Sequence, residues 1–84
     1  METGYPDGWD EVDGALQRTF EFANFVDAIA FVNRVADAAE QANHHPDISI
    51  HGYRHVTLRY WTHSKNAITE NDIAQARRAA ELSG

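Results

Sequence analysis

The chain has 84 residues and no cysteine, and its 13 acidic against 7 basic residues give a formal net charge of −6. This length allows one domain and excludes a second, since a domain typically needs about 50 residues, and the lack of cysteine excludes disulfides, thiolate nucleophiles and cysteine zinc sites. The negative charge and the scattered basic residues argue against direct nucleic-acid binding, and no apolar run reaches the roughly 18 residues of a membrane span.

The first predicted element is a β-hairpin over residues 9–22. It turns at Asp13-Gly14, a dipeptide that supplies the positive φ angles of a tight turn. The apolar residues of the second arm share one parity, which is typical of a strand with one buried face: Leu16, Phe20 and Phe22.

A long amphipathic helix is predicted next. Asn24 is a good N-cap, and Asp27 places a carboxylate in the first turn, at the positive end of the helix dipole. The helix must end near Asn43 or His44, because Pro46 disfavours helical geometry at the residue before it. The apolar residues that recur at three- and four-residue spacing form the face turned to a sheet: Phe25, Ala28, Ile29, Val32, Val35, Ala36 and Ala39.

A second hairpin and a last helix complete the pattern. Alternation over residues 48–51 and 54–62, with a turn at Gly52, predicts two strands. A capping box from Thr69 to Asp72 opens a helix that runs to about Leu82. The order β-β-α-β-β-α predicts an α+β domain, with a four-stranded antiparallel sheet of two hairpins and helices packed on one face. We assign residues 8–84 to this domain and residues 1–7 to a short N-terminal tail.

Two of the five histidines lie together before a proline, in His44-His45-Pro46. His44 falls at the end of the predicted helix, where the dipole favours a protonated ring. Glu40 precedes it by one turn, so its carboxylate could orient the His44 imidazole for proton transfer. The alternative interpretation is a polar helix end with a solvated Glu40, and the residues alone leave both open.

The other histidines do not suggest a metal site. No His-Glu-x-x-His helix occurs, and His51 and His55 fall on opposite sides of the predicted turn. His63 lies at the end of the last predicted strand, where functional sites gather, although surface histidines are common there too. Trp61 sits among polar residues on the open face of the sheet, which suggests a subunit interface or a flat ligand.

Taken together, these residues resemble the signature of the pterin-4a-carbinolamine dehydratase family. The resemblance covers about residues 8 to 82, with the spacing preserved across the predicted elements. The residues that carry it are Glu40, His44-His45-Pro46, Tyr53, Thr62-His63 and Asp72, with Gly8-Trp9-x-Glu11-Val12, Phe20-x-Phe22 and Ile68-Thr69 around them.

The resemblance implies dehydration of a 4a-hydroxytetrahydropterin to the quinonoid dihydropterin, which recycles the cofactor of an aromatic amino acid hydroxylase. No metal or organic cofactor is implied. His44, His45 and His63 correspond to the active-site histidines, with His63 or His45 as the acid and His44, supported by Glu40, as the base. The residues that correspond to the pterin-binding site are Glu40, Trp9, Asp72 and Pro46.

The resemblance also implies partners and an alternative role. A homodimer or homotetramer in the cytoplasm is expected. Some members act instead as dimerisation cofactors of a transcription factor or as assembly factors, and degraded histidines would indicate that role, whereas this chain keeps all three. Family members usually carry a helix before the first hairpin, and the eight residues before Trp9 are too few for it. Ala67 stands where the family commonly has glycine, and Asn43 where an acid is often found.

Overall fold

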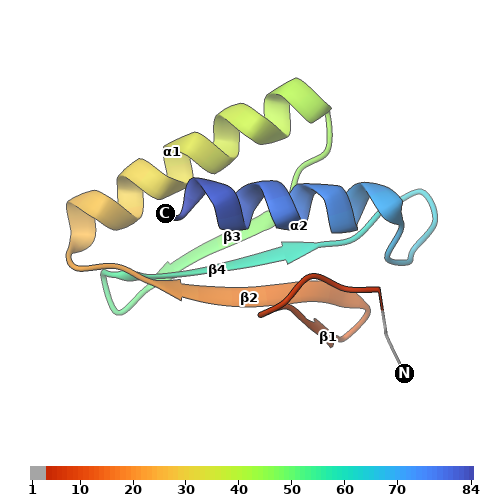
Figure 1. Ribbon diagram of the computed structural model, residues 1–84, viewed down its shortest axis with the longest axis horizontal. Helices are drawn as coiled ribbons and strands as arrows, with labels where there is room; N and C mark the ends of the chain where they lie inside the picture. Colours follow the sequence, from red (N-terminus) through yellow and green to blue (C-terminus); the bar gives the residue numbers. More distant parts are fainter. Residues whose placement is uncertain (1–3) are drawn as a thin grey trace.

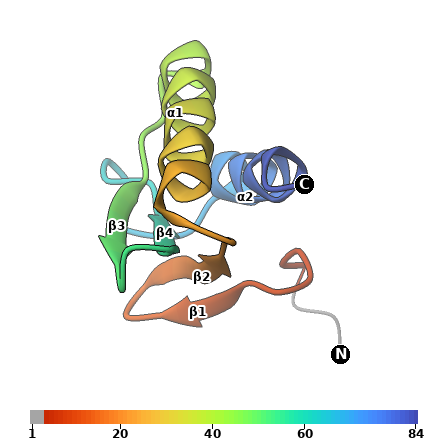
Figure 2. The ribbon, with the colours of Figure 1, turned by 90° about the vertical axis from the view of Figure 1, so that its left-hand side faces the viewer.

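Within residues 4–84, which the computed structural model describes, two helices lie on one face of a four-stranded antiparallel sheet (Figure 1 and Figure 2). The strands pair in the order β1-β2-β4-β3, so the two hairpins join through β2 and β4. The predicted α+β class and element order are confirmed. The elements are β1 (Asp10–Val12), β2 (Ala15–Glu21), α1 (Phe25–Ala42), β3 (Asp47–His51), β4 (His55–Tyr60) and α2 (Glu70–Leu82).

The first hairpin turns at the predicted dipeptide. Val12 pairs with Ala15, and the two residues between them take positive φ angles, 49° at Asp13 and 82° at Gly14. A type I′ turn requires positive φ at both central positions, and its twist matches that of the flanking strands. Of the predicted tail, residues 1–3 lie outside the described part, while Tyr5 is partly buried against the core.

Helix α1 begins and ends where the sequence indicates. The side-chain oxygen of Asn24 accepts a hydrogen bond from the backbone N–H of Asp27 at 2.8 Å, which satisfies one of the free donors of the first turn. At the other end Asn43 takes the left-handed conformation, with φ 51°, and the N–H of His44 donates to the carbonyl of Ala39. This C-cap changes the direction of the chain immediately before the His44-His45 pair.

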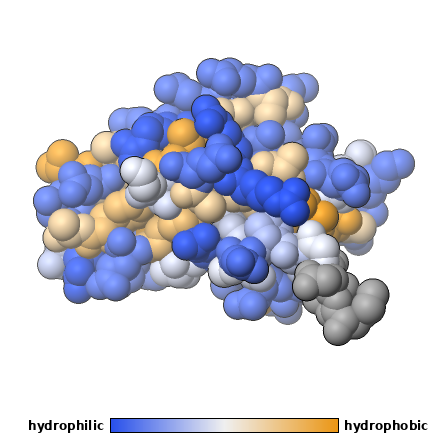
Figure 3. Space-filling view, viewed as in Figure 1, coloured by the Kyte–Doolittle hydropathy of each residue, from blue (hydrophilic) through white to orange (hydrophobic). Residues whose placement is uncertain are grey.

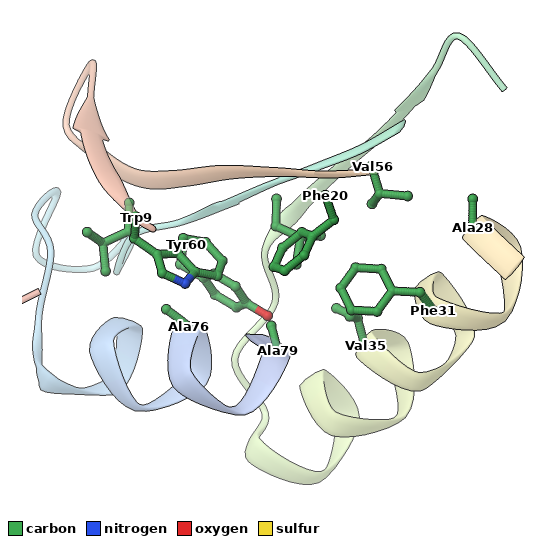
Figure 4. Close-up of a cluster of buried hydrophobic side chains, with 11 residues drawn as sticks. Trp9, Phe20, Ala28, Phe31, Val35, Val56, Tyr60, Ala76 and Ala79 are labelled. Carbon is green, nitrogen blue, oxygen red and sulfur yellow. The ribbon is translucent and has the colours of Figure 1, made fainter. Parts of the chain in front are cut away.

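The core lies between the sheet and the two helices (Figure 4). Phe31 and Val35 of α1 point toward the sheet, and Ala76 and Ala79 are the residues with which α2 approaches it. The small alanine side chains allow a close approach of α2. The remaining large side chains of this cluster come from the sheet and from the residue just before it. They are Leu16, Phe20, Val56, Leu58 and Tyr60 of the strands and Trp9, which precedes β1.

Hydrophilic residues cover most of the face viewed in Figure 3, and hydrophobic residues occur between them in small groups. Neither described helix is long and apolar enough to cross a membrane.

Tyr60 gives the fold a pH dependence in the alkaline range. The side chain is 2% exposed, and burial raises its pKa from 10 to about 12. The folded state therefore holds the phenol proton more tightly than the unfolded chain does. The resulting stabilisation is fully present below pH 10 and is lost as the pH rises from 10 to about 12. A shift of this size corresponds to a loss on the order of 2–3 kcal/mol in the free energy of unfolding.

Urea unfolding measured at intervals between pH 8 and pH 12 checks this expectation. Tyr60→Phe keeps the ring and removes the titrating group, so the variant should lose less stability than the wild type over the same range. An identical loss in both proteins would show that other groups cause it.

Candidate active site

A cavity of about 240 Å³ lies where the end of α1 meets the chain that follows β4. Both segments lie at the same end of the molecule (Figure 1). The three histidines singled out in the sequence all line this cavity, although they come from two segments far apart in the chain. The lining residues are Asn43, His44, His45, Trp61, Thr62, His63 and Ser64.

His44 is held by a buried carboxylate. Its Nε2 atom lies 2.5 Å from Oδ1 of Asp72, and the side chains are 12% and 0% exposed. The other carboxylate oxygen, Oδ2, accepts hydrogen bonds from the backbone N–H of Thr69 and from the hydroxyl of Thr62, both at 2.8 Å. A fully buried carboxylate needs such partners, because burial without them is costly. On another side the His44 ring stacks on Tyr60, with 6.4 Å between the ring centroids.

His45 pairs with Glu40, on the outside of the molecule. Its Nε2 atom lies 2.6 Å from Oε2 of Glu40, and both side chains are largely exposed. The expectation that Glu40 orients His44 is wrong, since the structure places Glu40 beside His45 instead. The spacing rule behind that expectation holds only while the helix continues. Because Asn43 takes the left-handed conformation, His44 turns toward α2 and His45 takes the place beside Glu40.

His63 stacks on Trp61, with 4.3 Å between the ring centroids and 22° between the planes. The guanidinium of Arg59 lies 5.6 Å from the centroid of the same Trp61 ring. His63 begins a short loop that is closed where Thr62 and Ala67 exchange backbone hydrogen bonds. Trp61, which the sequence marked as a candidate for contact with a flat ligand, thus forms one side of the cavity together with His63.

None of the four residues expected at the pterin site lines the cavity, and Glu40 and Asp72 reach it only through the histidines that they contact. Trp9 is 5% exposed in the core, where it contacts Phe20 and Tyr60 (Figure 4). Pro46 is half-buried beside the cavity-lining histidines. Asp72 reaches the site only through His44, since its carboxylate is completely buried.

Thr62 is a site residue that no motif indicates beyond its place beside His63. Its hydroxyl joins the carboxylate of Asp72 to the hydroxyl of Thr69, which lies 2.6 Å away. The signal was present in the strand pattern, because Thr62 continues the parity of the buried residues Leu58 and Tyr60 and so points toward the helices.

The arrangement is suited to proton transfer. Imidazole exchanges protons near neutral pH, and three imidazoles around one cavity can supply both an acid and a base. Among the described residues, no three histidine or carboxylate side chains are grouped so that they could hold a metal ion.

Comparison with known proteins identifies the family. The profile of the family described as pterin 4 alpha carbinolamine dehydratase matches residues 2–82. A protein of Thermomicrobium roseum, provisionally named as a pterin-4-alpha-carbinolamine dehydratase, is 56% identical over 75 residues, which are 89% of this chain and 80% of that protein. One of Mycobacterium avium with the same provisional name is 51% identical over 71 residues, 84% of this chain and 74% of that protein.

Solved structures agree with this assignment. The crystal structure of a transcriptional coactivator/pterin dehydratase from Brucella melitensis has a TM-score of 0.86 and 39% identity, over 93% of this chain and 84% of that one. A pterin dehydratase-like protein identified as a RuBisCO assembly factor in the alpha-carboxysome shares the fold, with a TM-score of 0.73 and 23% identity over 90% and 87% of the two chains. The chain therefore belongs to the pterin 4 alpha carbinolamine dehydratase family, a family of lyases.

Proposed function

We propose that this protein dehydrates a 4a-hydroxytetrahydropterin to the quinonoid dihydropterin by histidine general acid–base catalysis, without a metal or organic cofactor. The observation that carries the proposal is the cavity at which His44, His45 and His63 meet. Family membership supports the choice of a pterin as substrate.

The reaction needs one base and one acid. A ring N–H of the pterin gives up its proton, the released electron pair forms the double bond to C4a, and the C4a–O bond breaks. The leaving hydroxide takes a proton and departs as water, so the step is a balanced elimination without oxidation or reduction. We assign the base to His44, because the buried Asp72 carboxylate holds its ring in place. The acid is one of the two exposed histidines at the cavity, His63 or His45.

The rate of loss of the 4a-hydroxytetrahydropterin absorbance, with and without purified protein, tests the proposal. Circular dichroism on the same sample establishes that the protein is folded. We expect a rate above the uncatalysed dehydration that rises in proportion to protein concentration. A folded wild type that leaves the rate unchanged would remove the dehydratase proposal and favour the interaction role of related proteins.

The biological setting follows from the proposed reaction. A 4a-hydroxytetrahydropterin is what remains of a tetrahydropterin cofactor after hydroxylation, so the enzyme would serve an aromatic amino acid hydroxylase in the same cell by dehydrating it. The cysteine-free sequence suits the reducing cytoplasm as the compartment.

The exposed edge of the sheet supports a homo-oligomer. Every residue of β3 is exposed, including Ile48 at 37% and Ile50 at 38%. Such an edge presents unpaired backbone groups that readily pair with another strand. We propose that β3 pairs with β3 of a second copy of this chain. Antiparallel pairing centred on Ser49 would set Ile48 opposite Ile50 and Asp47 opposite His51, which joins apolar to apolar and acid to base.

The oligomeric state in solution tests this pairing. Light scattering coupled to size exclusion should give a dimer or tetramer for the wild type, and Ile50→Lys should shift it to the monomer. Val26→Lys, at an exposed hydrophobic residue of α1, is the matched control and should leave the wild-type mass. A monomeric wild type would exclude the oligomer, and an Ile50→Lys variant with the wild-type mass would exclude β3 as its interface.

A further inference from the structure

The hydrogen bonds around Asp72 fix which of its oxygens accepts from which group. The backbone N–H of Thr69 points at Oδ2 and can only donate. The hydroxyl of Thr62 also donates to Oδ2, since an ionised carboxylate has no proton to give. Oδ2 is therefore surrounded by donors, and Oδ1 is the oxygen left for His44.

The two threonine hydroxyls reinforce this direction. Their oxygens lie 2.6 Å apart, so one can donate to the other. Thr62 has a single hydroxyl proton, which it gives to Asp72. Thr69 then donates to Thr62 or to Oδ2 itself, which lies 3.4 Å from its oxygen, and in either case the hydroxyl protons are directed toward Asp72.

The contact with Oδ1 of Asp72 determines which nitrogen of the His44 ring carries a proton. Oδ1 of Asp72 accepts, so the ring nitrogen 2.5 Å from it, Nε2, must carry a proton. The other nitrogen, Nδ1, makes no hydrogen bond within the described part of the chain, while the residue lines the cavity. In the neutral ring Nδ1 is consequently the atom with a free lone pair.

We infer that Asp72, directed by Thr62 and Thr69, is a positioning residue that fixes His44 in the Nε2-protonated tautomer and makes Nδ1 the nitrogen that exchanges protons in the cavity. That the proton comes from a pterin N–H rests on the proposed function, whereas the assignment of the His44 tautomer does not. In the proposed reaction Nδ1 takes the pterin N–H proton and the ring becomes an imidazolium. Asp72 stays ionised and stabilises that cation, as the orienting carboxylate of a catalytic triad does.

The variant Asp72→Asn tests the inference, because the threonines dictate how the amide lies. Its carbonyl oxygen must take the place of Oδ2, because the hydroxyl of Thr62 and the backbone N–H of Thr69 both donate to that position. Its NH₂ group then faces Nε2 of His44 and forces that nitrogen to accept, which moves the ring proton to Nδ1. We expect ¹⁵N NMR of His44 to show protonated Nε2 in the wild type and protonated Nδ1 in the variant. We expect kcat/KM to fall by about 10²-fold, since the base is then blocked by its own proton.

Two further variants separate positioning from general damage. Asp37→Asn makes the same chemical change at an exposed residue of α1 and should alter neither the His44 spectrum nor the rate. Thr62→Val removes one donor to Oδ2 but leaves the carboxylate, so the wild-type tautomer should persist with a smaller loss of rate than Asp72→Asn causes. A purely structural role for Asp72 would lower stability without moving the proton from one ring nitrogen to the other.

The outcomes distinguish this inference from the proposed function. A tautomer switch in a protein that has no dehydratase activity would support the positioning role and refute the reaction. An active wild type whose Asp72→Asn variant keeps the Nε2 proton and the rate would overturn the positioning role and leave the reaction in place. If Asp72→Asn does not fold, the wild-type spectrum still decides, because a proton on Nδ1 and none on Nε2 would overturn the inference.

Discussion

Replacing His44 or His63 by alanine is expected to lower the dehydration rate by about 10²- to 10⁴-fold in each case, which is the contribution of one general acid or base. Both side chains line the cavity, and they enter it from different segments, so each substitution removes a separate proton-transfer group. The loss should appear mainly in kcat, because the groups act on protons that move only in the transition state.

His55→Ala provides the matched control. His55 belongs to β4 and lies near Glu21, with 3.8 Å between Nε2 and Oε2, and it does not line the cavity. Its removal should change the rate by no more than a few-fold. If His44 and His63 act in the same step, the double variant will lose less than the product of the single losses, since the remaining group cannot work alone. Near-wild-type rates in both single variants would exclude histidine catalysis.

The local elements of this fold could be predicted because the signals that set them lie within a few residues. The Asp13-Gly14 turn, the Asn24 cap and the Pro46 stop each act on neighbouring backbone, and the structure confirms the elements they bound. The predicted strand over 54–62 was too long at its end, since β4 stops at Tyr60. Tyr60 pairs with Leu16 near the start of β2, so the residues beyond it have no long partner strand there.

The partners of the site residues could not be predicted from spacing alone. One residue in the left-handed conformation, Asn43, redirects both histidines that follow it, and helical spacing cannot anticipate that change. The sequence explained Asp72 as part of a capping box, which the structure also contains. Its contact with His44 joins the end of α1 to the start of α2, and no local pattern encodes such a pairing.

Phe31→Ala should greatly lower the free energy of unfolding. The side chain is fully buried on α1, with its ring centroid 4.8 Å from that of Phe20 and 5.0 Å from that of Phe22. Truncating a buried phenylalanine costs about 3–5 kcal/mol through lost transfer energy and the cavity left behind. The total free energy of unfolding of a small domain is about 5–15 kcal/mol, so the variant should be close to unfolding at moderate temperature.

Urea unfolding followed by circular dichroism measures this loss, with Phe25→Ala as the control. Phe25 lies on the same helix but is 51% exposed, so its truncation should change the free energy of unfolding by about 0.5 kcal/mol or less. A loss below about 1 kcal/mol for Phe31→Ala would mean that the core around this ring can collapse to fill the space.

The same variant separates stability from catalysis. Phe31 holds α1 against the sheet, whereas the His44 ring is oriented by Asp72 and Tyr60. Under conditions in which Phe31→Ala remains folded, the rate per folded molecule should therefore stay near that of the wild type. Asp72→Asn should behave in the opposite way, with a larger effect on the rate than its effect on stability can explain, because it changes the proton on His44.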